Sequence, residues 1–155
     1  MTFQILALPA RLFQPLFGLP DTALASHGAK RVRAQEDPGY PCRVSLRDAA
    51  VGETLLLLNF EHQPAPTPYR ASHAIFVREG ASQAQLAPGE VPLLFRHRLI
   101  SLRAFSDAGM MLNADAAEGR ELEAAITTLL APAEVSYLHL HYAKPGCYAA
   151  RVERV

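Results

Sequence analysis

The segment "YLHLHYAKPGCYAARV" at residues 137–152 has the most suggestive spacing of reactive side chains in this chain. His139 and His141 are two residues apart, and in a β-strand such residues project from the same face. Two imidazoles at this spacing can chelate a metal ion, but a site needs a third ligand, and the side chains of a suitable type are Cys147, His73 and His62. Because no Cys-x-x-Cys or His-Glu-x-x-His motif supplies one, we expect no metal site, with His139 and His141 as the alternative metal-ligating pair.

Cys147 follows a Pro-Gly turn that could leave its thiol accessible. With His139 or His141 as a base, Cys147 could be a catalytic nucleophile or a redox thiol. This interpretation depends on strand register. If "AKPG" is the whole turn, Cys147 shares the face of the leucines and lies away from the histidines, whereas a slip of one residue reverses this. Only one other cysteine, Cys42, is present, so we expect two thiols rather than a disulfide framework.

Residues 61–73 collect unlike polar groups around prolines at every second position from 64 to 68. That proline spacing excludes a helix and predicts a stiff, extended loop, and long loops of this kind are often functional. An arginine fork can hold a carboxylate or a phosphate, and a tyrosine adds a flat apolar surface. The candidate ligand-binding residues are His62, Tyr69, Arg70 and His73.

Predicted strands flank this loop and would hold it in place. "TLLLLNF" at 54–60 has apolar side chains on both faces, which predicts a strand in the middle of a sheet, and "HAIFVRE" at 73–79 has the same character. The final two strands are predicted in "VSYLHLHY" and "CYAARVERV", joined by "AKPG". We therefore expect a pocket between loop 61–73 and the C-terminal hairpin.

One amphipathic helix is predicted at about 116–131, where apolar residues from Leu122 to Leu130 form a single stripe. Asp115 and Glu118 resemble a capping box at its start. A short helix is expected near 91–97. Because strands outnumber helices and most connections are short, the predicted fold is α+β, a single domain over 1–155 with a mainly antiparallel sheet.

Composition limits the classes of partner. The chain has 15 basic and 15 acidic residues, so no positive excess favours nucleic acid. No apolar run is long enough to span a membrane, and the apolar N-terminal segment is broken by prolines and lacks a basic leader, so we expect a cytoplasmic protein. No phosphate-binding loop, dinucleotide fingerprint or nucleophile elbow is present, and no cofactor is indicated by a motif.

Three strings, "GYPCRVSLRDA", "YRASHAIFVRE" and "GCYAARVERV", occur in this order along the chain. Together they resemble a bacterial family known as domain of unknown function 1203, over nearly the whole chain from about Phe3 to Val155. The resemblance implies a single domain and brings no established reaction, ligand or catalytic residue.

The sequence therefore leaves three alternative functions. The first is binding of a small, anionic ligand in the pocket between loop 61–73 and the C-terminal hairpin. The second is a cysteine-dependent enzyme or redox protein that uses Cys147 with a nearby histidine. The third is a protein-interaction module that pairs through an exposed sheet edge.

Overall fold

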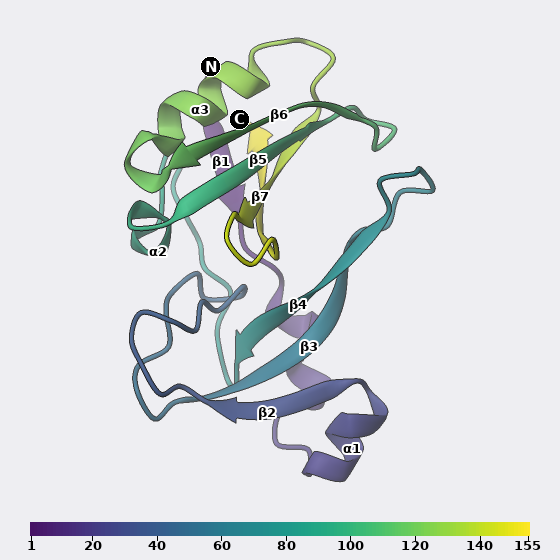
Figure 1. The fold of residues 1–155 in the computed structure, drawn as a ribbon, viewed down its shortest axis with the longest axis vertical. Helices are drawn as coiled ribbons and strands as arrows, with labels where there is room; N and C mark the ends of the chain where they lie inside the picture. The colour runs from purple at the N-terminus through teal and green to yellow at the C-terminus, as the bar shows by residue number, and fades with distance from the viewer.

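The structure, a computed structural model, describes all residues 1–155 and places eight strands in two antiparallel sheets (Figure 1). The first sheet has the strand order β1-β8-β7-β5-β6, with β1 (Phe3–Leu6), β5 (Leu99–Phe105), β6 (Met111–Glu118), β7 (Tyr137–Tyr142) and β8 (Tyr148–Arg154). The second has the order β2-β3-β4, with β2 (Ala29–Arg33), β3 (Thr54–Gln63) and β4 (Ala71–Arg78). The predicted α+β class with mainly antiparallel strands is confirmed, although the strands form two sheets.

Helices are few and short. The α-helices are α1 (Asp21–Ser26), α2 (Leu93–Arg96) and α3 (Leu122–Leu130), and single 3-10 turns are η1 (Ala10–Leu12), η2 (Gln14–Leu16) and η3 (Gly119–Glu121). The short helix expected near 91–97 is α2. None of these helices has the length and apolar character that crossing a bilayer requires.

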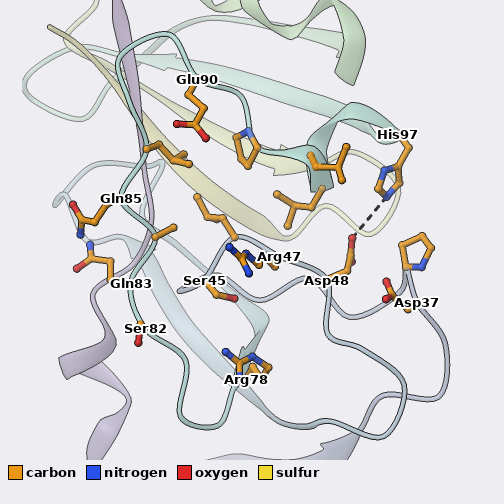
Figure 2. Close-up of a pocket in the computed structure, with 17 residues that line it drawn as sticks. Asp37, Ser45, Arg47, Asp48, Arg78, Ser82, Gln83, Gln85, Glu90 and His97 are labelled. Carbon is orange, nitrogen blue, oxygen red and sulfur yellow. Dashed lines mark ion pairs between the residues drawn. The ribbon is translucent and has the colours of Figure 1, made fainter.

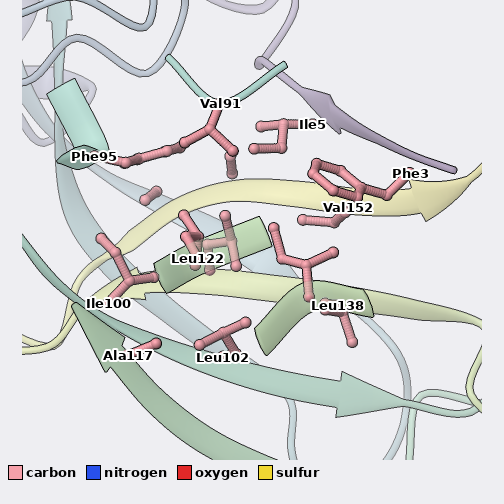
Figure 3. Close-up of a cluster of buried hydrophobic side chains, with 14 of the residues drawn as sticks. Phe3, Ile5, Val91, Phe95, Ile100, Leu102, Ala117, Leu122, Leu138 and Val152 are labelled. Atoms are coloured by element: carbon pink, nitrogen blue, oxygen red, sulfur yellow. The ribbon is translucent and has the colours of Figure 1, made fainter. Parts of the chain in front are cut away.

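The larger core lies between the five-stranded sheet and α3, which covers the face of this sheet that points away from β2, β3 and β4 (Figure 1). Figure 3 shows Leu122 of α3 among the strand residues Ile100 and Leu138. Because side chains alternate along a strand, filling this core with Leu138 and Leu140 commits the residues between them to the opposite face.

The second core cluster joins the two sheets. Leu56 and Leu58 of β3 and Ile75 and Val77 of β4 pack together with Tyr148 of β8. The three-stranded sheet therefore rests on the face of the five-stranded sheet that α3 leaves free. This contact is what brings the β3–β4 hairpin to the histidines of β7.

The prediction that β3 is a central strand is confirmed, since β3 pairs with both β2 and β4. The corresponding prediction for residues 73–79 is wrong, because β4 is an edge strand of its sheet. Its free edge is nevertheless covered. Cys42 forms a bridge with Phe76, and the Arg43 N–H donates to the Phe76 carbonyl oxygen at 3.0 Å. This cover explains why β4 has an apolar character typical of an interior strand.

The start of the main helix was predicted six residues too early. Residues up to Glu118 extend strand β6, in which Asp115 pairs with Leu102, so the capping box at Asp115 and Glu118 is not formed. Pairing with β5 outweighs the local helix signal, because residues 116–121 contain none of the large apolar side chains that bury a helix face. The stripe itself is confirmed, with Leu122, Ile126, Leu129 and Leu130 buried.

The predicted loop at 61–73 is shorter than expected. Strand β3 extends to Gln63 and β4 begins at Ala71, so the prolines lie in a turn of residues 64–70 and His62 and His73 belong to strands. Thr67 Oγ1 of this turn donates to the Gly109 carbonyl oxygen at 3.1 Å. The tip of the β3–β4 hairpin is thereby attached to the β5–β6 turn.

Candidate functional site

Strand β7 places a row of polar aromatic side chains on the face opposite the leucines. Tyr137, His139 and His141 alternate with Leu138 and Leu140, and all five are buried. The leucines belong to the core under α3, so the tyrosine and both histidines face the three-stranded sheet. In the ladder with β5, His139 lies opposite Arg103 and His141 lies opposite Ser101.

A β-bulge on β3 directs two consecutive side chains towards β7. The pairing of β3 with β4 shifts between Glu61 and Gln63, which leaves His62 as the extra residue. Such a bulge breaks the strict alternation of side chains, and His62 and Gln63 are both buried as a result. Gln63 Nε2 donates to the Tyr137 hydroxyl at 2.9 Å, so this end of β3 is fixed directly to β7.

His73 reaches the same place from β4. Its side chain lies on the same face of β4 as those of Ile75 and Val77, which pack between the sheets. His73 therefore points towards the five-stranded sheet at the open end of this interface, and it is half-buried. Three strands thus contribute imidazoles to one cluster, which we call the histidine cluster: His62, His73, His139 and His141.

One ring nitrogen from each of His62, His73 and His141 lies within 4.8 Å of the other two. His62 Nε2 and His73 Nδ1 are 2.7 Å apart, and their ring planes differ by 7°. The ring of His141 stands nearly perpendicular to both. The edges of three imidazoles therefore converge on one small volume, an arrangement that a metal ion could fill.

The backbone orients His141 for such a role. Its Nδ1 lies 3.0 Å from the Gly146 carbonyl oxygen, which can only accept a hydrogen bond, so Nδ1 carries the proton. Nε2 then has a free lone pair, and it is buried without any hydrogen-bond partner. A histidine whose second nitrogen donates to a carbonyl is the usual arrangement around a metal-ligating imidazole.

The cluster is held in its neutral form. Burial lowers the pKa of His62 to about 4, with further lowering from His73 and Arg103, and burial lowers the pKa of His139 to about 3. Burial also lowers the pKa of His141 to about 2, although the bond to Gly146 acts in the opposite direction. The pKa of the more exposed His73 is lowered too, by burial first and by Arg103 second. Neutral imidazoles are the form that ligates metals.

Two arginines lie next to the cluster, and neither was among the site residues predicted from the sequence. Arg151 lies opposite His139 on β8 and is paired with Glu153. Arg103, on β5, has no acidic partner. Its charge lowers the pKa of all four imidazoles. The guanidinium takes part in none of the eight ion pairs of the structure and in no side-chain hydrogen bond. Arg103 pairs with His139 in the β5–β7 ladder, so its side chain lies on the same face of the sheet as the histidines. The alternation of side chains along β5 is the sequence signal that could have pointed to it.

Two predicted ligand-binding residues lie outside the cluster. Arg70 Nε pairs with Glu61 Oε2 at 3.0 Å, and both side chains are exposed. Tyr69 contacts the ring of Phe105 edge-on, with centroids 6.3 Å apart. The segments 61–73 and 137–150 do lie together, but the histidines and the Gln63–Tyr137 hydrogen bond form the contact, rather than Tyr69 and Arg70.

Cys147 lies on the other side of the hairpin. The Tyr142 N–H donates to the Cys147 carbonyl oxygen at 3.0 Å, which is the register with "AKPG" as the whole turn. Its side chain packs against the core under α3, and Cys147 Sγ accepts a hydrogen bond from Arg43 Nη2 at 3.0 Å. No hydrogen bond joins Cys147 to His139 or His141, so the structure does not bring the expected nucleophile and base together. Cys42 and Cys147 are both free thiols.

Two cavities lie apart from the histidine cluster. The larger, of about 870 Å³, lies between residues 37–48 and 78–97 and is lined by side chains of both charges (Figure 2). Within it, His97 Nε2 lies 3.7 Å from Asp48 Oδ2. The smaller, of about 400 Å³, is lined by Cys147 and Arg43. The histidine cluster is nevertheless the stronger metal-site candidate, because three ring nitrogens converge there, two of them from buried histidines.

Comparison with known proteins identifies a family and nothing more specific. Residues 39–154 match the family described as "Protein of unknown function (DUF1203)". The match begins at residue 39, later than the resemblance suggested. No curated protein and no solved structure matches the chain.

Proposed function

The chain belongs to the DUF1203 family, and we propose that it binds a divalent transition-metal ion through His62, His73 and His141. The observation that carries this proposal is the convergence of one ring nitrogen from each of these three histidines within 4.8 Å. In addition, His141 has a buried Nε2 without any hydrogen-bond partner. Imidazole ligands suit Zn²⁺, Cu²⁺ and Ni²⁺, and three of them leave a fourth position for an exchangeable ligand.

The three histidines must adjust to hold an ion, because their ring nitrogens are now up to 4.8 Å apart. Ligand nitrogens around a tetrahedral zinc ion are about 3.3 Å apart, since each zinc–nitrogen bond is about 2.0 Å long. His62 Nε2 and His73 Nδ1 are 2.7 Å apart because they share a proton, and an ion in place of this proton would separate them by roughly half an ångström. His73 lies at the open end of the interface, so its ring has room for this movement.

The proposed ligand of the fourth position is a small anion. Three neutral imidazoles leave the double charge of the ion uncompensated, and no carboxylate belongs to the group of converging side chains. The unpaired guanidinium of Arg103 on the neighbouring strand would add a second attraction for a carboxylate or a phosphate. The anionic ligand expected between residues 61–73 and the C-terminal hairpin is therefore proposed here with Arg103, not Arg70, as its cationic partner.

Calorimetric titration with Zn²⁺ of protein purified without chelator tests the proposal. We expect one equivalent to bind to the wild-type chain and to His27→Asn, a matched control in which an exposed histidine outside the cluster is changed. His73→Asn should weaken binding by about 100-fold or more, because it removes a direct ligand and even changes to the partners of a ligand cost about 10- to 100-fold. Equal affinities for His73→Asn and His27→Asn, or no binding by the wild-type chain below millimolar Zn²⁺, would contradict it.

A further inference from the structure

We propose a second ligand site, separate from the histidine cluster, in the cavity of about 400 Å³ beside Cys147, and we assign it to a small organic anion. Tyr142 lines this cavity, whereas its neighbour His141 faces the other side of β7, so the sheet itself separates the two sites. The charged and reactive groups around the cavity are Arg43, His97, Arg98, Tyr142, Lys144 and Cys147. No aspartate or glutamate lines it.

Arg43 is the strongest argument for an anion. Its side chain is only 1% exposed, and its guanidinium donates to the Pro41 and Tyr148 carbonyl oxygens and to Cys147 Sγ. None of these three acceptors is a carboxylate, so a buried positive charge has no counter-ion from the chain. Burying an unpaired charge is costly, and an anion bound in the adjoining cavity would compensate it.

The other two permanent cations contribute differently. Arg98 is neutralised by Asp48, whose two carboxylate oxygens accept from Nη1 at 2.9 Å and from Nη2 at 2.6 Å. Lys144, in the β7–β8 turn, is exposed and makes no ion pair. The uncompensated charge at the cavity therefore comes from Arg43 inside and Lys144 at the rim.

Tyr142 is an independent sign of a missing partner. Two guanidiniums lie over its ring, with Arg43 Cζ 4.8 Å and Arg98 Cζ 5.3 Å from the ring centroid. The residue is 4% exposed, yet its hydroxyl has no hydrogen-bond partner in the protein. Burial raises the pKa of Tyr142, so the hydroxyl keeps its proton and can donate. A buried donor left unsatisfied is unfavourable, and an anionic acceptor would satisfy it.

The apolar side chains that line the cavity indicate that the anion also has an apolar part. Phe76, Leu99 and Pro41 add apolar surface to the same cavity. A small molecule with one carboxylate or phosphate group and a short apolar body would match both parts of the lining. Cys147 lies in the wall, so its reactivity reports on occupancy of the cavity.

The test uses alkylation of Cys147 in the full chain. Iodoacetate carries the proposed charge and iodoacetamide does not, so we expect the iodoacetate-to-iodoacetamide rate ratio at Cys147 to exceed that of N-acetylcysteine by about tenfold. Peptide mapping separates Cys147 from the buried Cys42. Lys144→Gln should lower the ratio by about threefold, whereas Lys30→Gln, which changes the only other lysine, should leave it unchanged.

Protection by anions identifies the chemical class. Succinate or inorganic phosphate, each compared with NaCl at equal ionic strength, should slow alkylation by iodoacetamide, and the more protective of the two shows which group the site prefers. A rate ratio equal to that of N-acetylcysteine, with no protection by either anion, overturns the proposal. A thiol that reacts in urea but with neither reagent in the folded protein also overturns it, because the cavity would then be closed to anions.

Discussion

His62 Nε2 lies 2.7 Å from His73 Nδ1, although the two residues come from different strands joined by a proline-containing turn. One proton lies between the two nitrogens, and neither ring is positively charged near neutral pH, because burial lowers both pKa values. An ion that binds here therefore displaces a proton from one ring nitrogen to another without releasing it to solvent.

Proton release upon zinc binding follows from this relationship. Three ordinary histidines with a pKa of about 6.5 would release roughly two protons at pH 6. The three histidines should release fewer protons at that pH, because burial lowers the pKa of His62 to about 4 and that of His141 to about 2, and it lowers the pKa of His73 as well. Calorimetry at pH 6 in buffers of different ionisation enthalpy measures this number. A release of two or more protons would show that the rings are charged before the ion binds.

Acid stability should depend on the buried histidines. The pKa values of His139 and His141, about 3 and about 2, lie below the ordinary value of 6.5 that the unfolded chain retains. The unfolded chain therefore takes up protons below pH 6.5 while the folded chain does not, and stability falls as the pH decreases. Each histidine contributes about 1.4 kcal/mol per pH unit.

Urea unfolding of the metal-free protein at pH 7, 6 and 5 measures this dependence. Two histidines together predict a loss of about 2–3 kcal/mol between pH 6 and pH 5. His62, with a pKa of about 4, adds roughly 1 kcal/mol to this loss. His139→Leu should therefore remove about a third of the slope, whereas the exposed control His27→Leu should keep it. An unfolding free energy that is the same at pH 7 and pH 5 would rule out neutral, buried imidazoles.

Arg103 should control anion binding at the bound metal. Its guanidinium lies on the strand next to the histidines and has no acidic partner, so it is free to attract an anion. In Co²⁺-loaded protein, acetate that enters the fourth position changes the visible absorption. Arg103→Met should weaken this acetate binding by about tenfold, and Arg33→Met, on the exposed end of β2, should not. Equal acetate affinities in the two variants would remove Arg103 from the site.

Gly119 lies in η3, between β6 and α3, and a substitution there tests the contact between η3 and α2. A Cβ atom at this position would overlap the carbonyl oxygen of Phe95, so Gly119→Ala should lower the unfolding free energy by about 3 kcal/mol. Gly146 provides the comparison, since its φ is +80° but the space that a Cβ atom would occupy there is open. Gly146→Ala should therefore cost only about 1 kcal/mol. A smaller loss for Gly119→Ala than for Gly146→Ala, in thermal or urea unfolding, would show that α2 and η3 are not in contact.

Local patterns predicted much of the fold and part of the site. The alternation in "YLHLHY" placed His139 and His141 on one face. The sequence left two registers open for the hairpin, and the structure has the one with "AKPG" as the whole turn, which puts Cys147 on the other face. The central position of β3 followed from its apolar faces. The shared face of the two histidines and the central position of β3 are determined by residues that are close to one another in the sequence, so local patterns can predict them.

The remaining features depend on pairing between distant segments. The bulge that turns Gln63 inward beside His62 is a mismatch between β3 and β4, and residues 116–118 become a strand because β5 is available to pair with them. Arg103 joins the histidines through the pairing of β5 with β7. The sequence named His62, His73 and His141 as candidates, but it could not show that they meet, and it did not single out Arg103.

The most direct test of the metal proposal is the anomalous scattering of zinc in crystals of the Zn²⁺-loaded protein. The proposal predicts one strong peak bonded to a ring nitrogen of each of His62, His73 and His141, at about 2.0–2.1 Å from each nitrogen. A zinc peak elsewhere on the molecule, or a cluster in which His62 and His73 remain hydrogen-bonded to each other at saturating Zn²⁺, would contradict it.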